Sequence, residues 1–326
     1  MVAVADDFTG AAEIAGIGLR YDLKLELQTE PDFDCDAELL VLDLNSRSST
    51  TEAAKKKMVN LSRQLKLFNP TFIYKKTDSV LRGHVLTELE TLMVGLEKDK
   101  ALLVPVNPSM GKTIAKGCYY IHGRKLHETE FAHDPEYPAV TSDVQELLGQ
   151  SQLFGITVSG TEDSLPTSGI VLGEAETAKD LAIWAAGLGP DTVAAGGGDF
   201  FATILEATFS PRIQTGARAE MAFADKPQLY VLGSSSENSR RAVSVLRKRG
   251  IPVCPLPGSP SHDNALNEAC LTLWIKETEE ALRQYGLALV VVDQPVQRSN
   301  GLPARLAELT ARLVKHIDRH FDLQGF

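Results

Sequence analysis

The chain has 326 residues, of which 43% are apolar, and a formal net charge of −10 at pH 7. This length provides for two domains with cores of their own, and the negative charge argues against a general binder of nucleic acid or anionic membranes. Four scattered cysteines without a CxxC pair, a start without a basic leader and the lack of a membrane-length apolar run predict a cytoplasmic protein.

The chain opens on a short apolar strand that two carboxylates follow at once. Val2 to Ala5 predict a strand buried on both faces, and Asp6 and Asp7 come next. Thr9 is the predicted N-cap of an alanine-rich amphipathic helix. Ligands of open α/β sheets bind at this carboxyl edge. For an Asp-Asp pair alone, one capping and one exposed acid is the favoured explanation.

Apolar runs then alternate with helical patterns, which predicts a parallel sheet. Strands are expected at 23–28, 37–45, 71–76 and 101–107, and helices at 50–67 and 85–97. Residues 108–140 form an irregular insert with a hairpin turn at His122-Gly123, and such inserts are more often functional than decorative. The domain continues with helices at 141–150 and 174–187, strands at 169–172 and 192–195, and a helix after GGGD at 196–199.

A polar segment with two prolines follows the first domain and predicts a linker. We expect domains at 1–210 and 228–326, joined by residues 211–227. The second domain should have strands near 229–232, 251–254 and 287–293, with helices after its first turn and at 264–284 and 303–320. The predicted fold class is therefore α/β, with a parallel-sheet N-terminal domain and a smaller, Rossmann-like C-terminal domain that is shortened.

The strand at 71–76 runs into a group of charged and small side chains, namely Lys75, Lys76, Asp78, Ser79, Arg82 and Gly83. Successive strand residues face opposite sides, so one of the two lysines is expected to point into a cleft. Arg82 could hold a ligand carboxylate with two parallel hydrogen bonds, and Gly83 would let a ligand approach the backbone. A helix start with surface ion pairs explains the same residues equally well.

Three later loops are candidate sites. Gly111-Lys112-Thr113 is not a P-loop, because Val106 stands where the first glycine should be, yet Lys112 could still bind an anion. The histidines of HETEFAHDP (127–135) predict a hydrogen-bonded loop rather than a metal site. The turn with Gly233, Ser234 and Ser236 precedes a helix, whose free amides suit a nucleotide phosphate; an ordinary capped turn is the alternative.

Together these motifs resemble the four-carbon acid-sugar kinases. ADDFTGAAEIAG, YKKTDSVLRGH, the loop from Pro105 through HETEFAHDP, GIVLGEAETAKDLAIWA and strand-GSSS-helix occur in the order typical of that family. The resemblance implies a sugar-acid site in the N-terminal domain and ATP with Mg²⁺ on the C-terminal domain. It also implies γ-phosphoryl transfer to the 4-hydroxyl of threonate, erythronate or 3-oxo-tetronate. Carried over by motif, the acid-sugar site comprises Asp6, Asp7, Lys76, Asp78 and Arg82, and Ser234 and Ser236 meet the nucleotide.

By position, Asp7 is expected to accept the hydroxyl proton. Two features depart from the family: GGGD at 196–199, where Gly-Ser is commoner, and an end at HIDRHFDLQGF, where a strand and a GGxT-like turn should follow. An alternative is therefore a protein that binds an acidic sugar without phosphorylating it. A nucleotide-linked oxidoreductase lacks the G-x-G-x-x-G fingerprint. The expected partner is a small acidic sugar, not nucleic acid or a membrane, and the chain could form a homodimer.

Overall fold

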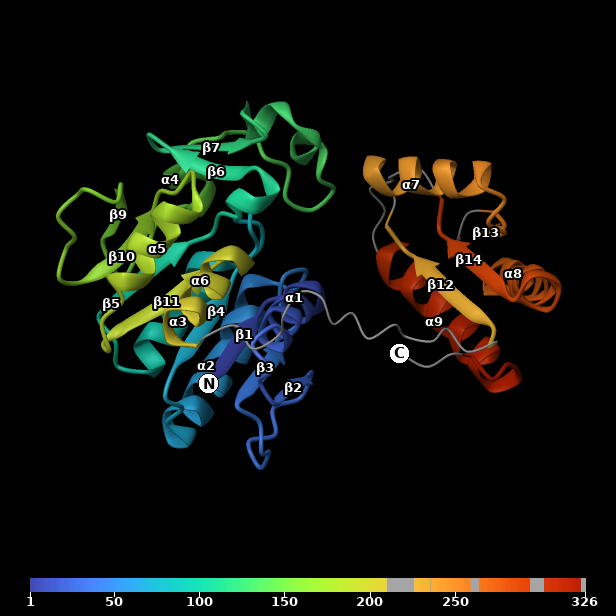
Figure 1. The fold of residues 1–326 in the computed structure, drawn as a ribbon, viewed down its shortest axis with the longest axis horizontal. Coiled ribbons are helices and arrows are strands. Elements are labelled where there is room, and N and C mark those ends of the chain that lie inside the picture. Colours follow the sequence, from blue (N-terminus) through green and yellow to red (C-terminus); the bar gives the residue numbers. More distant parts are fainter. Residues whose placement is uncertain (210–225, 235, 259–263, 294–301, 324–326) are drawn as a thin grey trace. The chain divides into compact units, whose positions relative to one another are not determined.

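The computed structural model describes residues 1–209, 226–234, 236–258, 264–293 and 302–323. The chain divides into a first unit, Met1–Ala217, and a second unit, Arg218–Phe326 (Figure 1). Most of the expected linker, 210–225, lies outside the described residues. The two units are described separately below.

The first unit is built on one eight-stranded parallel sheet with the order β2-β3-β1-β4-β11-β5-β10-β9. Its central strands β1 and β3 are buried along their whole length, which explains their continuous apolar sequences. The strands are β1 (Val2–Ala5), β2 (Leu25–Gln28), β3 (Leu39–Asp43), β4 (Ile73–Lys76), β5 (Lys100–Val104), β9 (Ile156–Ser159), β10 (Gly169–Gly173) and β11 (Thr192–Gly196).

Helices pack in two groups around this sheet. On one side α2 packs on α3, and on the other α6 packs on α1 and α5. The helices of this unit are α1 (Phe8–Leu19), α2 (Thr51–Phe68), α3 (Val85–Gly95), α4 (Val144–Leu148), α5 (Ala178–Ala186) and α6 (Gly198–Thr208). Every strand and helix predicted for this part of the chain is present, and β9 was not predicted. Asp7, not Thr9, caps α1, because the helix already begins at Phe8.

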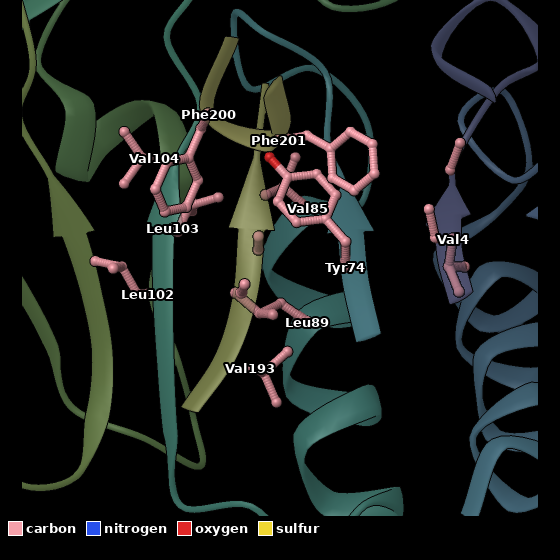
Figure 2. Close-up of a cluster of buried hydrophobic side chains, with 14 of the residues drawn as sticks. Val4, Tyr74, Val85, Leu89, Leu102, Leu103, Val104, Val193, Phe200 and Phe201 are labelled. Carbon is pink, nitrogen blue, oxygen red and sulfur yellow. The ribbon is translucent and has the colours of Figure 1, made fainter. Parts of the chain in front are cut away.

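The core beneath the carboxyl edge of the sheet also fixes the turn after β11. Figure 2 shows Tyr74 of β4 beside Phe200 and Phe201 of α6. The Tyr74 and Phe201 rings lie 4.9 Å apart between centroids, and the Tyr74 hydroxyl donates a 2.6 Å hydrogen bond to the Gly197 carbonyl. This buried bond holds the GGGD turn against the neighbouring strand end.

The insert at 108–140 carries a small antiparallel sheet, β6 (Lys112–Ala115), β7 (Cys118–Ile121) and β8 (Arg124–Lys125). The hairpin between β7 and β8 turns at His122-Gly123 as predicted, with Gly123 at a φ of 77°. The strand β6 was not predicted, because only four residues after the left-handed Gly111 form it. Three short 3₁₀ helices, Pro108–Met110, Leu126–Glu128 and Glu130–His133, complete the insert.

The second unit contains a three-stranded parallel sheet in the order β12-β14-β13. Its strands are β12 (Gln228–Leu232), β13 (Val253–Pro255) and β14 (Leu287–Val291), and its helices are α7 (Glu237–Lys248), α8 (Asn264–Tyr285) and α9 (Leu302–His320). Trp274 and the α9 stripe of Leu309, Leu313 and Ile317 fill the core. These elements confirm the α/β prediction. No described helix in either unit combines the length and apolarity needed to cross a bilayer.

Candidate functional site

Five neighbouring strands, β3, β1, β4, β11 and β5, end at one edge of the first unit's sheet. A polar side chain follows each of them: Arg47 after β3, Asp7 after β1, Asp78 after β4, Asp199 after β11 and Asn107 after β5. In parallel sheets this edge is where ligands bind. The sequence predicted the contributions of β1 and β4, and the sheet order adds the other three.

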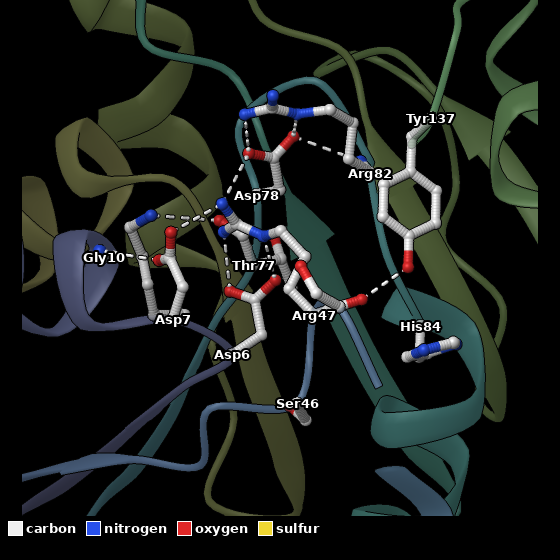
Figure 3. Close-up of polar contacts among 12 residues, drawn as sticks. Asp6, Asp7, Gly10, Ser46, Arg47, Thr77, Asp78, Arg82, His84 and Tyr137 are labelled. Atoms are coloured by element: carbon white, nitrogen blue, oxygen red, sulfur yellow. Dashed lines mark hydrogen bonds and ion pairs between the residues drawn. The ribbon is translucent and has the colours of Figure 1, made fainter. Parts of the chain in front are cut away.

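Arg47 joins the two aspartates to the β4 end (Figure 3). Its Nε and Nη2 donate to Asp6 Oδ2 and Oδ1 at 2.8 and 2.9 Å, and its Nη1 donates to Asp7 Oδ2 at 2.6 Å. The same Nη1 lies 3.5 Å from Asp78 Oδ1. Burial lowers the pKa of the guanidinium, but the hydrogen bond and charge of Asp6, with Asp78 and Asp7, raise that pKa overall. The ends of β1 and β4 therefore converge as predicted, and Arg47, which was not predicted, connects them.

Asp78 is held by Arg82 four residues later. Arg82 Nε and Nη2 donate to the two Asp78 oxygens at 3.1 and 2.8 Å, and Nη1 donates to Asp134 Oδ2 at 2.9 Å. Burial opposes ionisation of Asp78, but its bonds and charge contacts with Arg82 and Arg47 lower its pKa to about 2. The Arg82 fork holds a protein carboxylate and so orients Asp78, and the grip of Arg82 on a ligand carboxylate stays a prediction.

The two adjacent lysines of β4 point to opposite faces of the sheet. Lys75 is fully buried and pairs with Glu88 Oε2 of α3 at 2.8 Å. This burial and this carboxylate partner argue against the predicted contact of Lys75 with the substrate. Lys76 faces α1, where it pairs with Glu13 Oε2 at 3.0 Å. Next to it, the Thr77 hydroxyl is buried without a hydrogen-bond partner in the described part of the chain, which leaves one polar group unsatisfied at this strand end.

Lys112 of the insert reaches the same strand end. Its ammonium donates to Ser79 Oγ at 2.8 Å, and Tyr119 donates to the Ser79 carbonyl. Burial lowers the pKa of Lys112, while the nearby Asp78 charge raises it. Within the described ranges, Lys112 has no carboxylate within ion-pair distance, in contrast to Arg47, Lys76 and Arg82. It is thus the cation at this edge whose charge is least compensated.

Glycines at the edge make room for the charged side chains. Gly83 has a φ of 86°, and a Cβ there would lie 3.1 Å from Arg47 Cγ. A Cβ on Gly10 would lie 2.9 Å from Asp7 Oδ1, and one on Gly198 would lie 2.2 Å from Glu13 Oε1. The GGGD turn therefore lets α6 begin directly against Glu13.

The insert holds the loop that carries Arg47. Tyr137 donates to the Arg47 carbonyl, and Ser48 donates to Glu136 Oε2 at 2.7 Å. His84 Nε2 donates to the Ser49 carbonyl at 2.7 Å, and the His84 and Tyr137 rings meet edge to face. The insert thus fixes both arginines, because its Asp134 also binds Arg82. This accounts for its polar, irregular sequence.

The expected hydrogen-bonded loop at 127–135 is present: His127 Nδ1 is bonded to Ser142 Oγ at 2.8 Å. Among the residues that the structure describes, no three His, Cys, Asp or Glu side chains are grouped to hold a metal ion. The predicted nucleotide turn lies at the end of β12. Ser236 caps α7 by accepting from Ser239 N at 3.2 Å, Ser234 Oγ accepts from Ser236 N, and a Cβ on Gly233 would meet open space.

The depressed pKa of Asp78 predicts a pH dependence of stability. A carboxyl whose folded pKa is lowered from 3.8 to about 2 stabilises the fold above pH 4, and this contribution of about 2 kcal/mol is lost as the pH falls through 2. We expect the stability gap between wild type and Asp78→Asn to narrow below pH 4. Urea unfolding followed by the fluorescence of Trp184, in a Trp274→Phe background, measures the unfolding free energy of the first unit alone. A difference in this free energy between wild type and Asp78→Asn that stays constant from pH 7 to 2.5 would contradict the lowered pKa of Asp78.

Comparison with known proteins agrees with this geometry. Residues 1–201 match the family model described as a sugar-binding N-terminal domain. The D-threonate kinase of Salmonella typhimurium is 28% identical over 276 residues, or 77% of this chain and 61% of that protein. The D-threonate kinase of Bordetella bronchiseptica is 27% identical over 336 residues, or 95% of this chain and 78% of that protein. The 3-oxo-tetronate kinase of Brucella melitensis is 30% identical over 160 residues, or 47% of this chain and 36% of that protein. The chain belongs to the family of this sugar-binding N-terminal domain, and the three relatives named above are sugar-acid kinases.

Solved structures support the fold. A Salmonella typhimurium protein described as a putative tRNA synthase has a TM-score of 0.72 at 17% identity, covering 98% of this chain and 83% of that one. A Haemophilus influenzae family member has a TM-score of 0.64 at 18% identity, covering 98% and 84%. A domain of unknown function from Bordetella bronchiseptica, a domain-swapped dimer with bound citrate, has a TM-score of 0.56 at 23% identity, covering 96% and 80%. At these identities the likeness establishes the α/β fold alone.

Proposed function

We propose that this protein is an ATP-dependent kinase that phosphorylates the 4-hydroxyl of a four-carbon sugar acid: threonate, erythronate or 3-oxo-tetronate. The observation that carries the proposal is the Arg47-centred network, which brings Asp6, Asp7 and Asp78 from neighbouring strand ends to one edge of the sheet. Phosphoryl transfer requires mainly positioned charges of this kind. The names of the Salmonella, Bordetella and Brucella relatives support the same reaction.

Each end of the substrate has a candidate group in this site. Lys112, with Ser79 beside it, offers an ammonium without a carboxylate partner in the described chain, which suits the substrate carboxylate. Asp7 is partly exposed and lies at the start of α1, where it could accept the proton of the attacking hydroxyl. Lys76 lies close to Gly10, where a Cβ would be 3.2 Å from Lys76 Nζ. Asp78 and Arg82 complete the wall of the site.

The second unit fits a nucleotide at the turn after β12. Gly233 leaves the backbone accessible, Ser234 and Ser236 are exposed, and α7 directs its free amides toward this turn. These residues would hold phosphate oxygens of ATP. Mg²⁺ commonly binds through substrate phosphates with one or two carboxylates, so it requires no cage of protein ligands. When bound, ATP and Mg²⁺ would supply the phosphoryl group and neutralise its charge.

The test is coupled ADP release with ATP-Mg²⁺ and a panel of D-threonate, L-threonate, D-erythronate and 3-oxo-tetronate. We expect turnover with at least one of these acids, and release of no ADP with four-carbon polyols that lack the carboxylate. Absence of turnover with every acid, together with no ATP binding by calorimetry, would refute the kinase proposal.

A second candidate is an acidic-sugar-binding protein without transferase activity. It is favoured by the location of the whole charged network in the first unit and by a family match that covers residues 1–201. Thermal stabilisation by the acids but not by ATP-Mg²⁺ would select this candidate, because a ligand stabilises only the state that it binds. For either candidate we propose a homodimer, the kind of assembly named for the Bordetella structure.

Lys112→Met is expected to weaken sugar-acid binding about 10- to 100-fold, because it removes the ammonium assigned to the carboxylate. The melting temperature should not fall, since no ion pair in the described chain is broken. Isothermal titration of D-threonate measures the first effect and calorimetric unfolding the second. Lys125→Met, on the exposed strand β8, is the matched control; equal affinities for both variants would exclude Lys112 from the binding site.

A further inference from the structure

Both oxygens of the proposed base, Asp7, are occupied. Asp7 Oδ1 accepts from Gly10 N at 2.8 Å as the cap of α1, and Asp7 Oδ2 accepts from Arg47 Nη1 at 2.6 Å. A carboxylate oxygen in a short bond to a guanidinium is poorly placed to accept a proton from a hydroxyl. Each oxygen keeps a second lone pair, but release of one of these two bonds would make that oxygen a better proton acceptor. The bond to Gly10 belongs to the helix start, so the bond to Arg47 is the candidate.

Arg47 is arranged so that one edge is fixed and the other is free to exchange partners. Nε and Nη2 bind both oxygens of the buried Asp6, and this fork fixes the plane of the guanidinium. Nη1 carries two hydrogens, of which one is bonded to Asp7. Asp78 Oδ1 lies 3.5 Å from Nη1, an ion-pair distance but too long for a good hydrogen bond.

Solvent exposure also differs between the fixed and the exchangeable side of Arg47. The Asp6 side chain is 3% exposed, that of Arg47 16% and that of Asp7 27%. Exposure therefore increases from the fixed fork toward the Asp7 side. Gly83 supports the stem of Arg47, and Tyr137 binds its carbonyl. The backbone of Arg47 is thus held while its Nη1 lies beside Asp7, the proposed base.

We propose that Arg47 is a catalytic residue of the phosphoryl transfer: its Nη1 donates to an oxygen of the phosphoryl group and releases Asp7 Oδ2 for the attacking hydroxyl. This inference rests on the proposed function. In the balanced step, the 4-hydroxyl oxygen bonds to the γ-phosphorus, the bond from that phosphorus to the β–γ bridging oxygen breaks, and ADP leaves with its electron pair. The hydroxyl proton passes to Asp7.

The exchange conserves hydrogen bonds and places the cation where charge develops. Arg47 Nη1 loses a carboxylate acceptor and gains a phosphoryl oxygen, so the guanidinium remains satisfied. Negative charge in phosphoryl transfer is spread over the equatorial oxygens, which a guanidinium stabilises. The alternative is a purely structural Arg47 that neutralises Asp6, Asp7 and Asp78. The two roles differ in whether Arg47 distinguishes a phosphorylated ligand from the free acid.

A binding experiment without ATP distinguishes a catalytic Arg47 from a purely structural one. D-threonate and its 4-phosphate are titrated calorimetrically into wild type, Arg47→Lys, Arg47→Ala and the exposed α2 control Arg63→Ala. We expect Arg47→Lys and Arg47→Ala to weaken the 4-phosphate about 10- to 100-fold and the free acid less than about threefold. An equal loss for both ligands, or no loss for either, would overturn the proposal. Arg47→Lys retains a positive charge among the carboxylates, so it keeps the test valid if Arg47→Ala does not fold.

Kinetics provide the second readout. In Arg47→Ala we expect kcat to fall about 10³-fold with little change in KM for the acid, and guanidinium in solution to restore part of kcat. A kcat within about threefold of wild type would refute the role of Arg47 while leaving the kinase proposal intact. If wild type itself releases no ADP, the kinase proposal fails, and the calorimetric difference between the two ligands still decides whether Arg47 meets a phosphoryl group.

Discussion

Asp7→Asn is expected to lower kcat by about 10²- to 10⁴-fold, the range that general-base catalysis contributes. The amide oxygen of asparagine can still accept from Gly10 N, and asparagine is as good an N-cap as aspartate, so α1 should start at the same residue. Arg47 would lose one acceptor but keep its fork on Asp6. The effect should therefore fall on proton acceptance, with the affinity for the acid changed by only a few-fold.

Steady-state ADP release and titration of D-threonate measure the two quantities. Asp36→Asn is the matched control, because Asp36 forms a surface ion pair with Lys24 far from the sheet edge. We expect the control to have wild-type kcat. A wild-type kcat in Asp7→Asn would move the base elsewhere. A large loss of affinity with unchanged kcat would instead make Asp7 a substrate-binding group.

The sequence was enough to predict several residues of this site, but not which side chains they contact. Asp6 and Asp7 could be placed at the end of a buried strand from local pattern alone, and so could Asp78 and Arg82. Arg47 could not, because its loop meets Asp6 only through the pairing of β3 with β1, which is a fact of sheet order. Its signal was the polar run SRSS (46–49) directly after the strand predicted at 37–45. A search of every strand end would have included it.

It was also predictable that the side chains of β4 alternate between the two faces of the sheet, but not which face each lysine occupies. Period two required that Lys75 and Lys76 face opposite sides. Which of them meets a carboxylate in the core depends on where α1 and α3 pack, and the helices supply Glu13 to one and Glu88 to the other. The contact of Arg82 with Asp134 was likewise not predictable from local sequence, because Asp134 lies 52 residues away in the insert.

Removing Lys75 should give the largest loss of stability among these changes. Lys75→Met leaves Glu88 ionised in the core, with the Ser46 hydroxyl as its remaining side-chain partner among the described residues. Breaking a buried pair by removing one member costs about 3–5 kcal/mol, because the remaining charge is desolvated without compensation. The urea unfolding free energy of the first unit should fall by this amount, while the affinity of the folded variant for D-threonate stays close to that of wild type.

The double variant Lys75→Met/Glu88→Gln should recover most of the loss, since glutamine carries no charge and can still accept from Ser46. The single variant should also lose less at lower pH. An unpaired buried carboxyl has a folded pKa above its unfolded value, so protonation favours the folded state as the pH falls. If Lys75→Met instead unfolded like wild type and bound the acid weakly, Lys75 would contact the ligand, and the separation of the two lysines by sheet face would be wrong.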